Sequence, residues 1–215
     1  LPQIISSNCK DTLSKCEKLF KKNDIRTISL TPKEAEFGKL MTNSWRYLEF
    51  AIANQFYMMA EADGIDFYKV FEAITKDYPR AKNFKGPGLT AGPCLFKDTM
   101  QLSAFSNNSF FLGHSAMLIN EGLPRFLVSK LENIIGSLKG KKIGILGMTF
   151  KPNCDDIRDS LSFKIKKEIL LKMGLPYETD VYWDEGFDLK FVLENSDAII
   201  LATPHDEYKN LKINK

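Results

Sequence analysis

Cys94 is the side chain in this sequence best suited to nucleophilic chemistry. It ends a segment rich in glycine and proline and precedes Lys97 and Asp98, where a helix is expected to begin. A helix N-terminus and a neighbouring lysine both favour the thiolate, which is the nucleophilic form of cysteine. Asp98, one turn further along, could orient a water molecule or act as a base. The spacing alone does not exclude the commoner alternative, a cysteine that is simply buried.

Lys39 and Asn43 form a second candidate pair. They are four residues apart, so a helix places them on one face. A lysine charge and an asparagine amide can together hold a negatively charged oxygen atom. The alternative, which the spacing alone favours, is a solvated helix face. Asn54 and Gln55, further along the same segment, are interpreted as packing polar groups or interface contacts.

A third group of residues could bind a nucleotide. A Gly-x-x-Gly turn at 144–147 follows an apolar run, but the full G-x-G-x-x-G fingerprint of dinucleotide-binding folds is absent. Phe150 could stack on a base, and Lys151 and Arg158 could meet phosphates or ribose. The alternative is a core ring beside two solvated cations. His205 follows a later apolar run, where α/β sheets place ligands, although a surface histidine is the favoured interpretation there.

These residues need a scaffold, and the strongest predicted element is a long helix over 32–63. Thr31 can cap this helix, and Glu34 completes a capping box. Pro32 suits the first helical position, and Gly64 ends the helix. At 1.5 Å per residue such a helix is about 46 Å long. Its apolar stripe indicates core packing or, along part of its length, a subunit interface. The stripe consists of Phe37, Leu40, Met41, Trp45, Leu48, Ile52, Phe56 and Met59.

The remaining pattern divides the chain into three parts. Residues 1–30 form a small α/β piece with too few elements to bury its own faces. Residues 31–139 form an all-helical central domain, apart from a glycine- and proline-rich loop over 79–93. Residues 140–215 alternate strand and helix, which indicates a small Rossmann-like parallel sheet. The predicted strands cover 2–6, 25–30, 142–147, 181–183 and 197–203, and the predicted helices cover 10–22, 32–63, 65–75, 97–105, 110–121, 124–138, 160–173 and 189–194. The fold class is therefore mixed: an all-α domain with one very long helix, followed by a small Rossmann-like α/β domain.

Composition sets further limits on function. The chain has 30 Lys plus Arg and 27 Asp plus Glu, and the resulting net charge of +3 is too mild to indicate a nucleic-acid partner. No apolar run has the length of a membrane span, and no signal peptide is visible. Four cysteines without C-x-x-C spacing, together with two histidines, indicate free thiols, no metal site and a cytoplasmic protein. The chain starts at Leu1 rather than Met, so we expect a fragment of a longer protein.

Three motifs in chain order make the sequence resemble a known family. They are Glu34-Ala35-Glu36 with Lys39 and Asn43, Gly86-Pro87-Gly88 through Cys94-Leu95-Phe96-Lys97-Asp98, and Gly147-Met148-Thr149-Phe150-Lys151-Pro152-Asn153 with Asp155-Asp156-Ile157-Arg158-Asp159-Ser160. Together they are similar to motifs of the UDP-glucose/GDP-mannose (nucleotide-sugar) 6-dehydrogenases. The resemblance spans nearly the whole chain, and the separation of Lys39 from Cys94 also fits this family.

The resemblance implies that a sugar C6 alcohol is oxidised to a carboxylate in two NAD-dependent steps. It implies that the thiol of Cys94 adds to the intermediate aldehyde. The thiohemiacetal then loses a second hydride to become a thioester, which water cleaves. In this scheme Lys39 and Asn43 hold the charged oxygen and the catalytic water, and Asp98 assists that water.

The same resemblance implies a UDP-sugar site and a homodimer. The loop from Phe84 to Gly92 would wrap the nucleotide-sugar, and Arg80 would reach the site across a dimer whose spine is the 32–63 helix. UDP-glucose is the first expectation for the sugar, because a Lys-Asp pair after the cysteine fits the UDP-glucose and GDP-mannose branches. UDP-N-acetylmannosamine or a related sugar stays open. The implied substrate-binding set is Phe84, Gly86, Gly88, Gly92, Phe150, Lys151, Arg80 and Arg158.

The sequence also departs from the family pattern. The N-terminal NAD-binding domain and its catalytic glutamate are absent, so the cofactor-binding residues are unknown, and residues 1–30 look like the last strands and helix of that domain. The strand-end Asp-Pro segment is reduced to residues 182–186, and Gln55 stands where the family often has glutamate. We therefore expect this chain alone not to catalyse the oxidation of a UDP-sugar by NAD. The rival interpretation is a short, non-catalytic module that binds a nucleotide-sugar or only dimerises.

Overall fold

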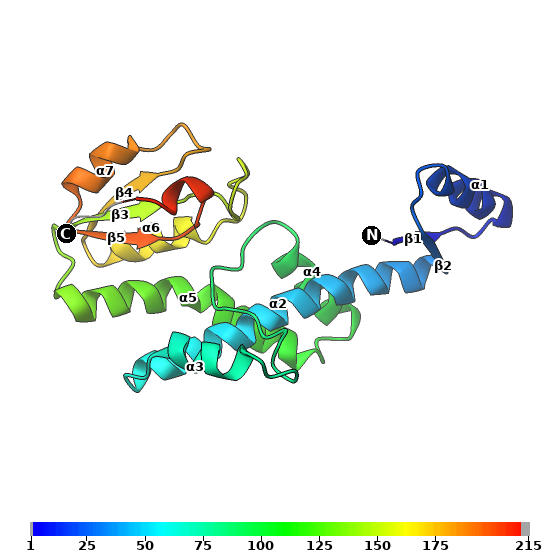
Figure 1. The fold of residues 1–215 in the computed structure, drawn as a ribbon, viewed down its shortest axis with the longest axis horizontal. Coiled ribbons are helices and arrows are strands. Elements are labelled where there is room, and N and C mark those ends of the chain that lie inside the picture. The colour runs from blue at the N-terminus through cyan, green and yellow to red at the C-terminus, as the bar shows by residue number, and fades with distance from the viewer. Residues whose placement is uncertain (1, 212–215) are drawn as a thin grey trace.

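The computed structural model describes residues 2–211 and arranges them in three parts along one long helix (Figure 1). Helix α2 (Pro32–Ala62) runs from a small unit at one end to a helical cluster at the other, and an α/β unit lies over α5 (Phe111–Ile135). The remaining helices are α1 (Lys10–Lys21), α3 (Phe67–Thr75), α4 (Leu95–Phe105), α6 (Ser162–Leu171) and α7 (Leu189–Asn195), and the strands are β1 (Gln3–Ser6), β2 (Thr27–Leu30), β3 (Lys142–Leu146), β4 (Leu175–Thr179) and β5 (Ala198–Leu201). This architecture confirms the predicted mixed fold class. Among the residues described, no helix is both long enough and apolar enough to cross a bilayer.

The N-terminal unit is a strand–helix–strand piece with almost no core. Strands β1 and β2 pair in parallel, from Gln3 opposite Thr27 to Ser6 opposite Leu30. Helix α1, which is described along its whole length, buries none of its side chains. A two-stranded sheet of this kind is marginal by itself because it has so little apolar surface to cover. The unit therefore has too few elements to bury its own faces, as predicted.

Helix α2 is the spine of the molecule and begins as its cap residues predict. The N–H of Thr31 donates to Glu34 Oε2 at 2.8 Å, and the N–H of Glu34 donates to Thr31 Oγ1 at 3.4 Å, which forms a reciprocal capping box. In its middle, Tyr47 and Ala51 pack with Leu95 and Ala116 in a small buried cluster. Because this cluster joins α2 to α4 and α5, it fixes the helices that carry the candidate catalytic residues.

The apolar stripe of α2 is largely open to solvent in this chain. Six of its large side chains have between 42% and 60% of their surface exposed. Core packing within one chain therefore accounts for only a small part of the stripe. The six are Phe37, Met41, Trp45, Ile52, Phe56 and Met59.

Helix α5 is continuous where the sequence predicts two helices. Gly122 and Pro124 were expected to divide the segment, but Pro124 lies buried inside a single 25-residue helix. A proline removes one backbone hydrogen bond and crowds the carbonyl of Asn120, four residues earlier. The helix continues because both of its halves are packed, one against α2 and α4 and the other against α6. Tertiary packing has overridden the local signal.

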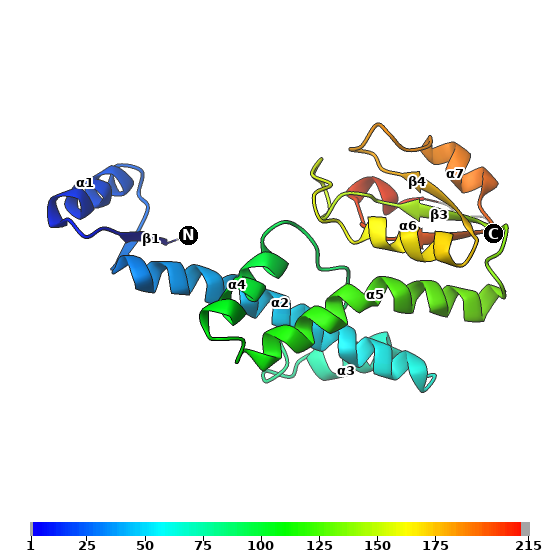
Figure 2. The same cartoon turned by 180° about the vertical axis from the view of Figure 1, so that it is seen from behind.

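The α/β unit is a three-stranded parallel sheet in the order β4-β3-β5. Helix α6 lies between the sheet and α5 in both views, and α7 covers the opposite face (Figures 1 and 2). The core between sheet and helices contains Ile143, Ile145, Ile165 and Ile169, all fully buried. Two ion pairs, Lys164 with Glu121 and Lys172 with Glu132, tie α6 to α5.

The second strand of the α/β unit lies earlier than predicted. The sequence predicts a strand over 181–183, whereas β4 is Leu175–Thr179, paired with β3 from Lys142 opposite Leu175. The aromatic and β-branched run Val-Tyr-Trp favours a strand over 181–183, whereas the strand that forms contains Pro176, which is tolerated because β4 is an edge strand. The acidic residue that directly follows this strand is therefore Asp180, and not a residue of the 182–186 segment.

Candidate active site

Lys39, Asn43 and Asp98 meet at a single carboxylate oxygen. Lys39 Nζ lies 2.8 Å from Asp98 Oδ2, and Asn43 Nδ2 donates to the same oxygen at 2.6 Å. The first two residues lie one helical turn apart on α2, and the third lies in the first turn of α4. The structure therefore brings together three residues that the sequence selected from segments more than fifty positions apart.

The carboxylate of Asp98 is held in its charged form. Burial by itself would raise the pKa of Asp98, but hydrogen bonds from Lys39 and Asn43 and the charges of Lys39 and Lys97 outweigh it, so the pKa is lowered. A carboxylate with a lowered pKa is a weak base at neutral pH. Asp98 is therefore better suited to orienting an ammonium group, an amide and a water molecule than to removing a proton.

Cys94 is exposed at the start of α4. The helix begins at Leu95, two residues earlier than predicted, so Cys94 is its N-terminal flanking residue. The N–H of Asp98 donates to the carbonyl of Cys94 at 2.9 Å, which places the acid one turn beyond the thiol. The alternative of a buried cysteine is thus wrong, and the thiol lies exposed at the N-terminal flank of α4.

The glycine-rich loop is fastened to the scaffold by two buried asparagines. Asn54 Nδ2 donates to the carbonyl of Gly88 at 3.1 Å, and the N–H of Gly88 donates back to Asn54 Oδ1 at 2.8 Å. Asn54 also donates to Asn120 Oδ1 at 2.9 Å, and Asn120 donates to the carbonyl of Tyr47 at 3.0 Å. The sequence analysis interpreted Asn54 only as a packing or interface residue. An asparagine on the apolar side of a predicted helix was the signal that could have pointed to this role.

A cavity of about 810 Å³ lies between the helical cluster and the α/β unit. Its walls come from α2, from the loop that precedes Cys94, from α5, and from the segments that follow β3 and β5. Of the predicted site residues, those that line it are Asn43, Gly88, Gly92, Cys94, Phe150, Lys151 and Arg158. A volume of this size suits a nucleotide-sized ligand.

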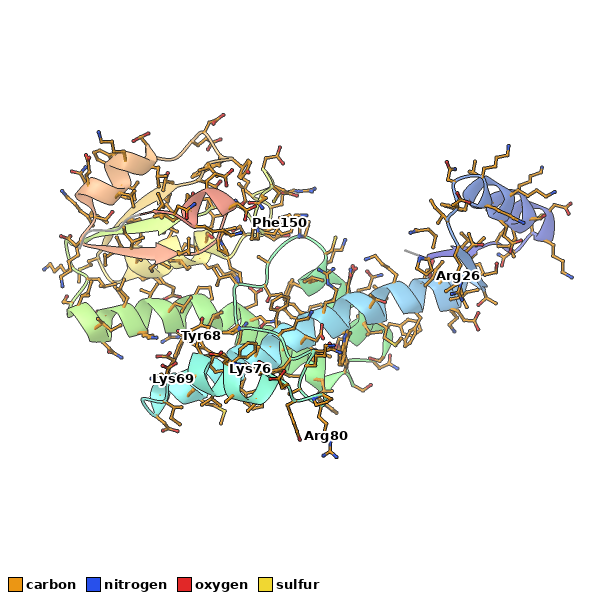
Figure 3. All side chains as sticks on the ribbon, viewed as in Figure 1. Arg26, Tyr68, Lys69, Lys76, Arg80 and Phe150 are labelled. Carbon is orange, nitrogen blue, oxygen red and sulfur yellow. The ribbon has the colours of Figure 1, made fainter. Side chains whose placement is uncertain are left out.

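Gly92 and Phe150 close one side of this cavity by direct contact. Gly92 has a φ of +104°, and a Cβ atom at this position would lie 2.6 Å from the ring of Phe150. The N–H of Gly92 also donates to the carbonyl of Asp159 at 3.4 Å. Figure 3 shows Phe150 at the edge of the α/β unit that faces the glycine-rich loop. Only glycine fits here, because both the backbone angle and the ring exclude a side chain.

The cations near Phe150 are partly engaged with other groups. Arg158 donates to both carboxylate oxygens of Asp156, through Nε at 2.9 Å and Nη2 at 2.7 Å. These hydrogen bonds lower the pKa of Asp156 to about 2. Lys151 Nζ lies 5.3 Å from the centre of the Phe150 ring. A phosphate at this place would meet one unpaired cation and one arginine that already carries a counter-ion.

Five predicted residues are not among those that line the cavity: Lys39 and Asp98, whose cluster reaches the cavity through Asn43, and Phe84, Gly86 and Arg80. Phe84 packs against Phe56 and Phe71, and neither it nor Gly86 is among the residues that line the cavity. Figure 3 shows Arg80 on the far side of α2 and α3 from Phe150. The binding roles of Phe84, Gly86 and Arg80 stay predictions.

His205 is not the surface histidine that the sequence favoured. It is fully buried, with Nε2 3.0 Å from Asp180 Oδ2 and 3.2 Å from Thr149 Oγ1. Asp180 Oδ2 also accepts the backbone N–H groups of Met148 and Thr149, at 2.5 and 3.1 Å. A dinucleotide phosphate would need those two amides, and a carboxylate already occupies them. The turn after β3 therefore does not fit a dinucleotide.

Comparison with known proteins places these observations in context. The family model described as "UDP-glucose/GDP-mannose dehydrogenase family, central domain" matches residues 33–121, and the model described as "UDP-glucose/GDP-mannose dehydrogenase family, UDP binding domain" matches residues 144–215. The chain is 33% identical to a UDP-N-acetyl-D-mannosamine dehydrogenase of Methanocaldococcus jannaschii, over 83% of this chain and 42% of the relative. It is 32% identical to the protein of the same name from Pyrococcus horikoshii, over 97% of this chain and 51% of the relative.

A solved structure shows the same arrangement of elements. The UDP-glucose dehydrogenase of the hyperthermophilic archaeon Pyrobaculum islandicum superposes with a TM-score of 0.85 at 28% identity, over 98% of this chain and 52% of that one. This chain thus spans about half the length of the relatives that it matches.

Proposed function

This chain belongs to the UDP-glucose/GDP-mannose dehydrogenase family, and on that premise we propose that it forms the thiol-bearing and substrate-binding part of a UDP-sugar 6-dehydrogenase. One observation carries the proposal. The exposed thiol of Cys94 shares a cavity with Phe150 and Lys151, one helical turn from the Asp98 cluster. A nucleophile and a candidate nucleotide site thus line one cavity, which Asn43 of the Asp98 cluster lines as well.

The chemistry assigned to Cys94 is addition to a C6 aldehyde. The thiolate sulfur forms a bond to the carbonyl carbon, and the carbonyl π electrons move to oxygen, which becomes an alkoxide. The ammonium of Lys39 and the amide of Asn43 are the donors that stabilise this oxygen and take up its developing charge. The oxidation of the resulting thiohemiacetal to an acyl thioester needs a hydride acceptor, and no part of that step is assigned to these residues. When a water then adds to the thioester carbon, the sulfur leaves as thiolate, which restores Cys94, and the protons of the water pass to solvent.

Asp98 acts in this scheme by fixing its two donors. Its single oxygen Oδ2 holds both Lys39 and Asn43, so neither donor has to be ordered when the substrate arrives. Since the pKa of Asp98 is lowered, the carboxylate stays charged across the neutral range. Asp98 is accordingly an orienting group for the oxyanion site and its water.

The nucleotide is assigned to the α/β side of the cavity. Phe150 supplies a flat apolar face for a base or ribose, and Lys151 supplies a charge for the diphosphate. Two of the relatives cited above are named for UDP-N-acetyl-D-mannosamine and one for UDP-glucose. UDP-glucose remains our first choice, with UDP-N-acetylmannosamine as the competing sugar.

NAD is the oxidant that the family implies, and residues 2–211 do not fit it. Asp180 occupies the backbone amides of the β3 turn, and Gly144 packs against Val192 and Ser196 instead of opening toward a ligand. We therefore assign no step of the hydride transfer to the residues described. The proposal for them is limited to binding the UDP-sugar, adding the thiol and cleaving the thioester, and we expect this chain alone not to reduce NAD.

A homodimer along α2 completes the proposal. The exposed face that contains Trp45, Ile52 and Phe56 is an apolar stripe on a 31-residue helix, and a second copy of the chain would cover it. Arg80 is assigned to the partner's cavity, since it lies on the side of α2 away from its own. A cytoplasmic location is retained as part of the proposal.

The competing function is a nucleotide-sugar-binding module without catalysis. The poor fit of NAD among the described residues favours it for this chain in isolation. The two functions differ at Cys94, because a pure binding module gives no role to a thiol facing the sugar.

Protection of Cys94 from alkylation tests the proposal directly. The 215-residue chain is treated with iodoacetamide with UDP-glucose, with UDP-N-acetylmannosamine or with UDP alone, and each cysteine is followed by mass spectrometry. We expect a UDP-sugar to slow alkylation of Cys94 more than UDP does, because only the sugar reaches the thiol. Cys9 is exposed on the separate N-terminal unit and is the internal control. Equal alkylation of Cys94 with every ligand would refute the site.

A further inference from the structure

The loop that carries Phe150 and Lys151 is held from behind by a buried histidine that the proposed chemistry does not use. His205 is fully buried, and its Nδ1 accepts the backbone N–H of Asn153 at 3.0 Å. A ring nitrogen that accepts a hydrogen bond carries no proton, so the proton is on Nε2. Nε2 then donates to Asp180 Oδ2 at 3.0 Å. The ring is therefore fixed in one tautomer and one orientation.

Asp180 extends this contact to the other end of the loop. Its Oδ2 accepts the N–H groups of Met148 and Thr149, and its Oδ1 accepts the N–H of Tyr182 at 2.7 Å. A carboxylate that accepts several backbone N–H groups is a rigid anchor, because each hydrogen bond constrains its position. The pair of side chains thus holds the loop at residues 148–149 and again at residue 153.

Neighbouring groups keep the pair in place. The side chain of Asn153 donates to Asp206 Oδ2 at 2.8 Å, and its Oδ1 accepts the N–H of Asp206 at 3.1 Å. The rings of Tyr182 and Tyr208 both pack on His205, with centres 5.0 and 5.3 Å from the centre of the imidazole. These ring contacts and the complete burial of His205 support the orientation that its hydrogen bonds set.

We infer that His205 and Asp180 are positioning residues that preorganise loop 148–153, so that Phe150 and Lys151 meet a uridine nucleotide without the loop first having to order. The inference rests on the proposed function for the identity of the ligand. Neither member of the pair touches the ligand. A loop that occupies its binding arrangement for only a tenth of the time binds about tenfold more weakly. Loss of the pair is therefore expected to lower the affinity for UDP by about this factor.

Three substitutions of the histidine separate its two hydrogen bonds. The amide nitrogen of His205→Gln takes the place of Nε2 as donor to Asp180 and leaves no acceptor at the place of Nδ1. The amide oxygen of His205→Asn takes the place of Nδ1 as acceptor for Asn153 and leaves no donor at the place of Nε2. His205→Phe keeps a ring in contact with the two tyrosines and removes both hydrogen bonds. Calorimetry of the 215-residue chain with UDP should give an affinity loss of about tenfold in His205→Phe and a smaller loss in the other two. His114→Phe, a histidine substitution in α5, is the matched control and should bind UDP unchanged.

A double-mutant cycle tests whether the pair acts through Phe150. If it does, His205→Gln combined with Phe150→Ala loses less affinity than the sum of the two single losses, because one of the two positioned groups is already gone. Fully additive losses would overturn the inference. The Gln variant is used in the cycle because it retains one hydrogen bond and so has the better prospect of folding.

Backbone amide exchange supplies a readout that needs no ligand. The amide of Asn153 should exchange faster in His205→Gln than in His205→Asn, and ¹⁵N spectra of the unchanged chain should show the Nε2–H tautomer. Unchanged exchange, or UDP binding that is equal in all three variants, would refute the inference while leaving the proposed function intact. Failure of the unchanged chain to bind UDP, with the exchange pattern as expected, would instead refute the UDP site and leave the support of the loop standing.

Discussion

Asn54 is the residue whose replacement most sharply tests how the cavity is held together. It is fully buried on α2 and makes three hydrogen bonds, two with Gly88 of the glycine-rich loop and one with Asn120 of α5. Asn54→Ala removes all three at once. We expect both the stability of the fold and the position of the loop to suffer, because one side chain serves both.

The size of the effect follows from what each partner can do afterwards. Asn120 is fully buried, so its Oδ1 loses a partner that water cannot replace, at a cost of about 1–3 kcal/mol. Gly88 is only half-buried, so its two backbone groups can bond to water, and each lost hydrogen bond costs about 1 kcal/mol. The sum is about 3–5 kcal/mol. For a chain of this length that corresponds to a fall in unfolding temperature of roughly 6–20 °C.

The loss of stability and the change in loop position are measured separately. Thermal unfolding by circular dichroism reports the loss of stability, and protection of Cys94 from alkylation by UDP-glucose reports the position of the loop. Gln55→Ala is the control, since Gln55 is the neighbouring half-buried polar residue of α2. It should change neither quantity appreciably.

A double substitution separates stability from loop anchoring. In Asn54→Leu combined with Asn120→Leu, no carbonyl oxygen of Asn120 is left without a partner, so most of the stability should return. Protection of Cys94 should stay low, because Gly88 is still unattached. If protection returned together with stability, or if Asn54→Ala behaved like Gln55→Ala, the assignment of Asn54 as the anchor of the loop would be wrong.

Three further predictions concern other parts of the chain. Because the pKa of Asp98 is lowered, its carboxylate stabilises the fold above the unfolded pKa, and this contribution is lost as pH falls through the lower folded pKa. The unfolding free energy of the unchanged chain should therefore fall more steeply below about pH 4 than the unfolding free energy of Asp98→Asn. Parallel pH dependence of the two free energies would contradict this. Gly147→Ala places a Cβ atom 2.5 Å from the backbone oxygen of Thr203 at a φ of +93°, whereas Gly136 has a φ of +78° and open space around it. Gly147→Ala should therefore lower the free energy of unfolding by at least about 2 kcal/mol more than Gly136→Ala does. Denaturant titration of the two variants measures this difference. Trp45→Glu puts a charge on the exposed face of α2 and should convert a dimer to a monomer in sedimentation velocity, whereas a monomeric unchanged chain would refute the proposed dimer.

Features governed by neighbouring residues could be predicted from the sequence. The start of α2 follows from Thr31, Pro32 and Glu34, which act on one another within a single turn. The three site motifs also lie in short segments, so their residue types were visible before their geometry. The meeting of Lys39, Asn43 and Asp98 needed the resemblance as well, because spacing alone favoured a solvated face for the first two.

Features decided by distant contacts could not be predicted in this way. Asn54 finds partners 34 and 66 residues away, and His205 finds Asn153 at a separation of 52. Each looked like an ordinary surface or packing residue in its own segment. Strand β4 and the continuous α5 were missed for a related reason: pairing with β3 and packing on both sides of Pro124 outweighed local propensities that pointed elsewhere.

In the proposed dimer, the open apolar face of α2 would link the folding of this chain to its concentration. A second copy that covered Phe37, Trp45 and Phe56 would bind the folded chain and not the unfolded one, so mass action would raise the apparent unfolding temperature as protein is added. Differences between variants are then meaningful only at one protein concentration. Dilution becomes an experiment in its own right: an unfolding temperature that falls on dilution measures how much of the stability of the fold belongs to the pair of chains and how much to each chain alone.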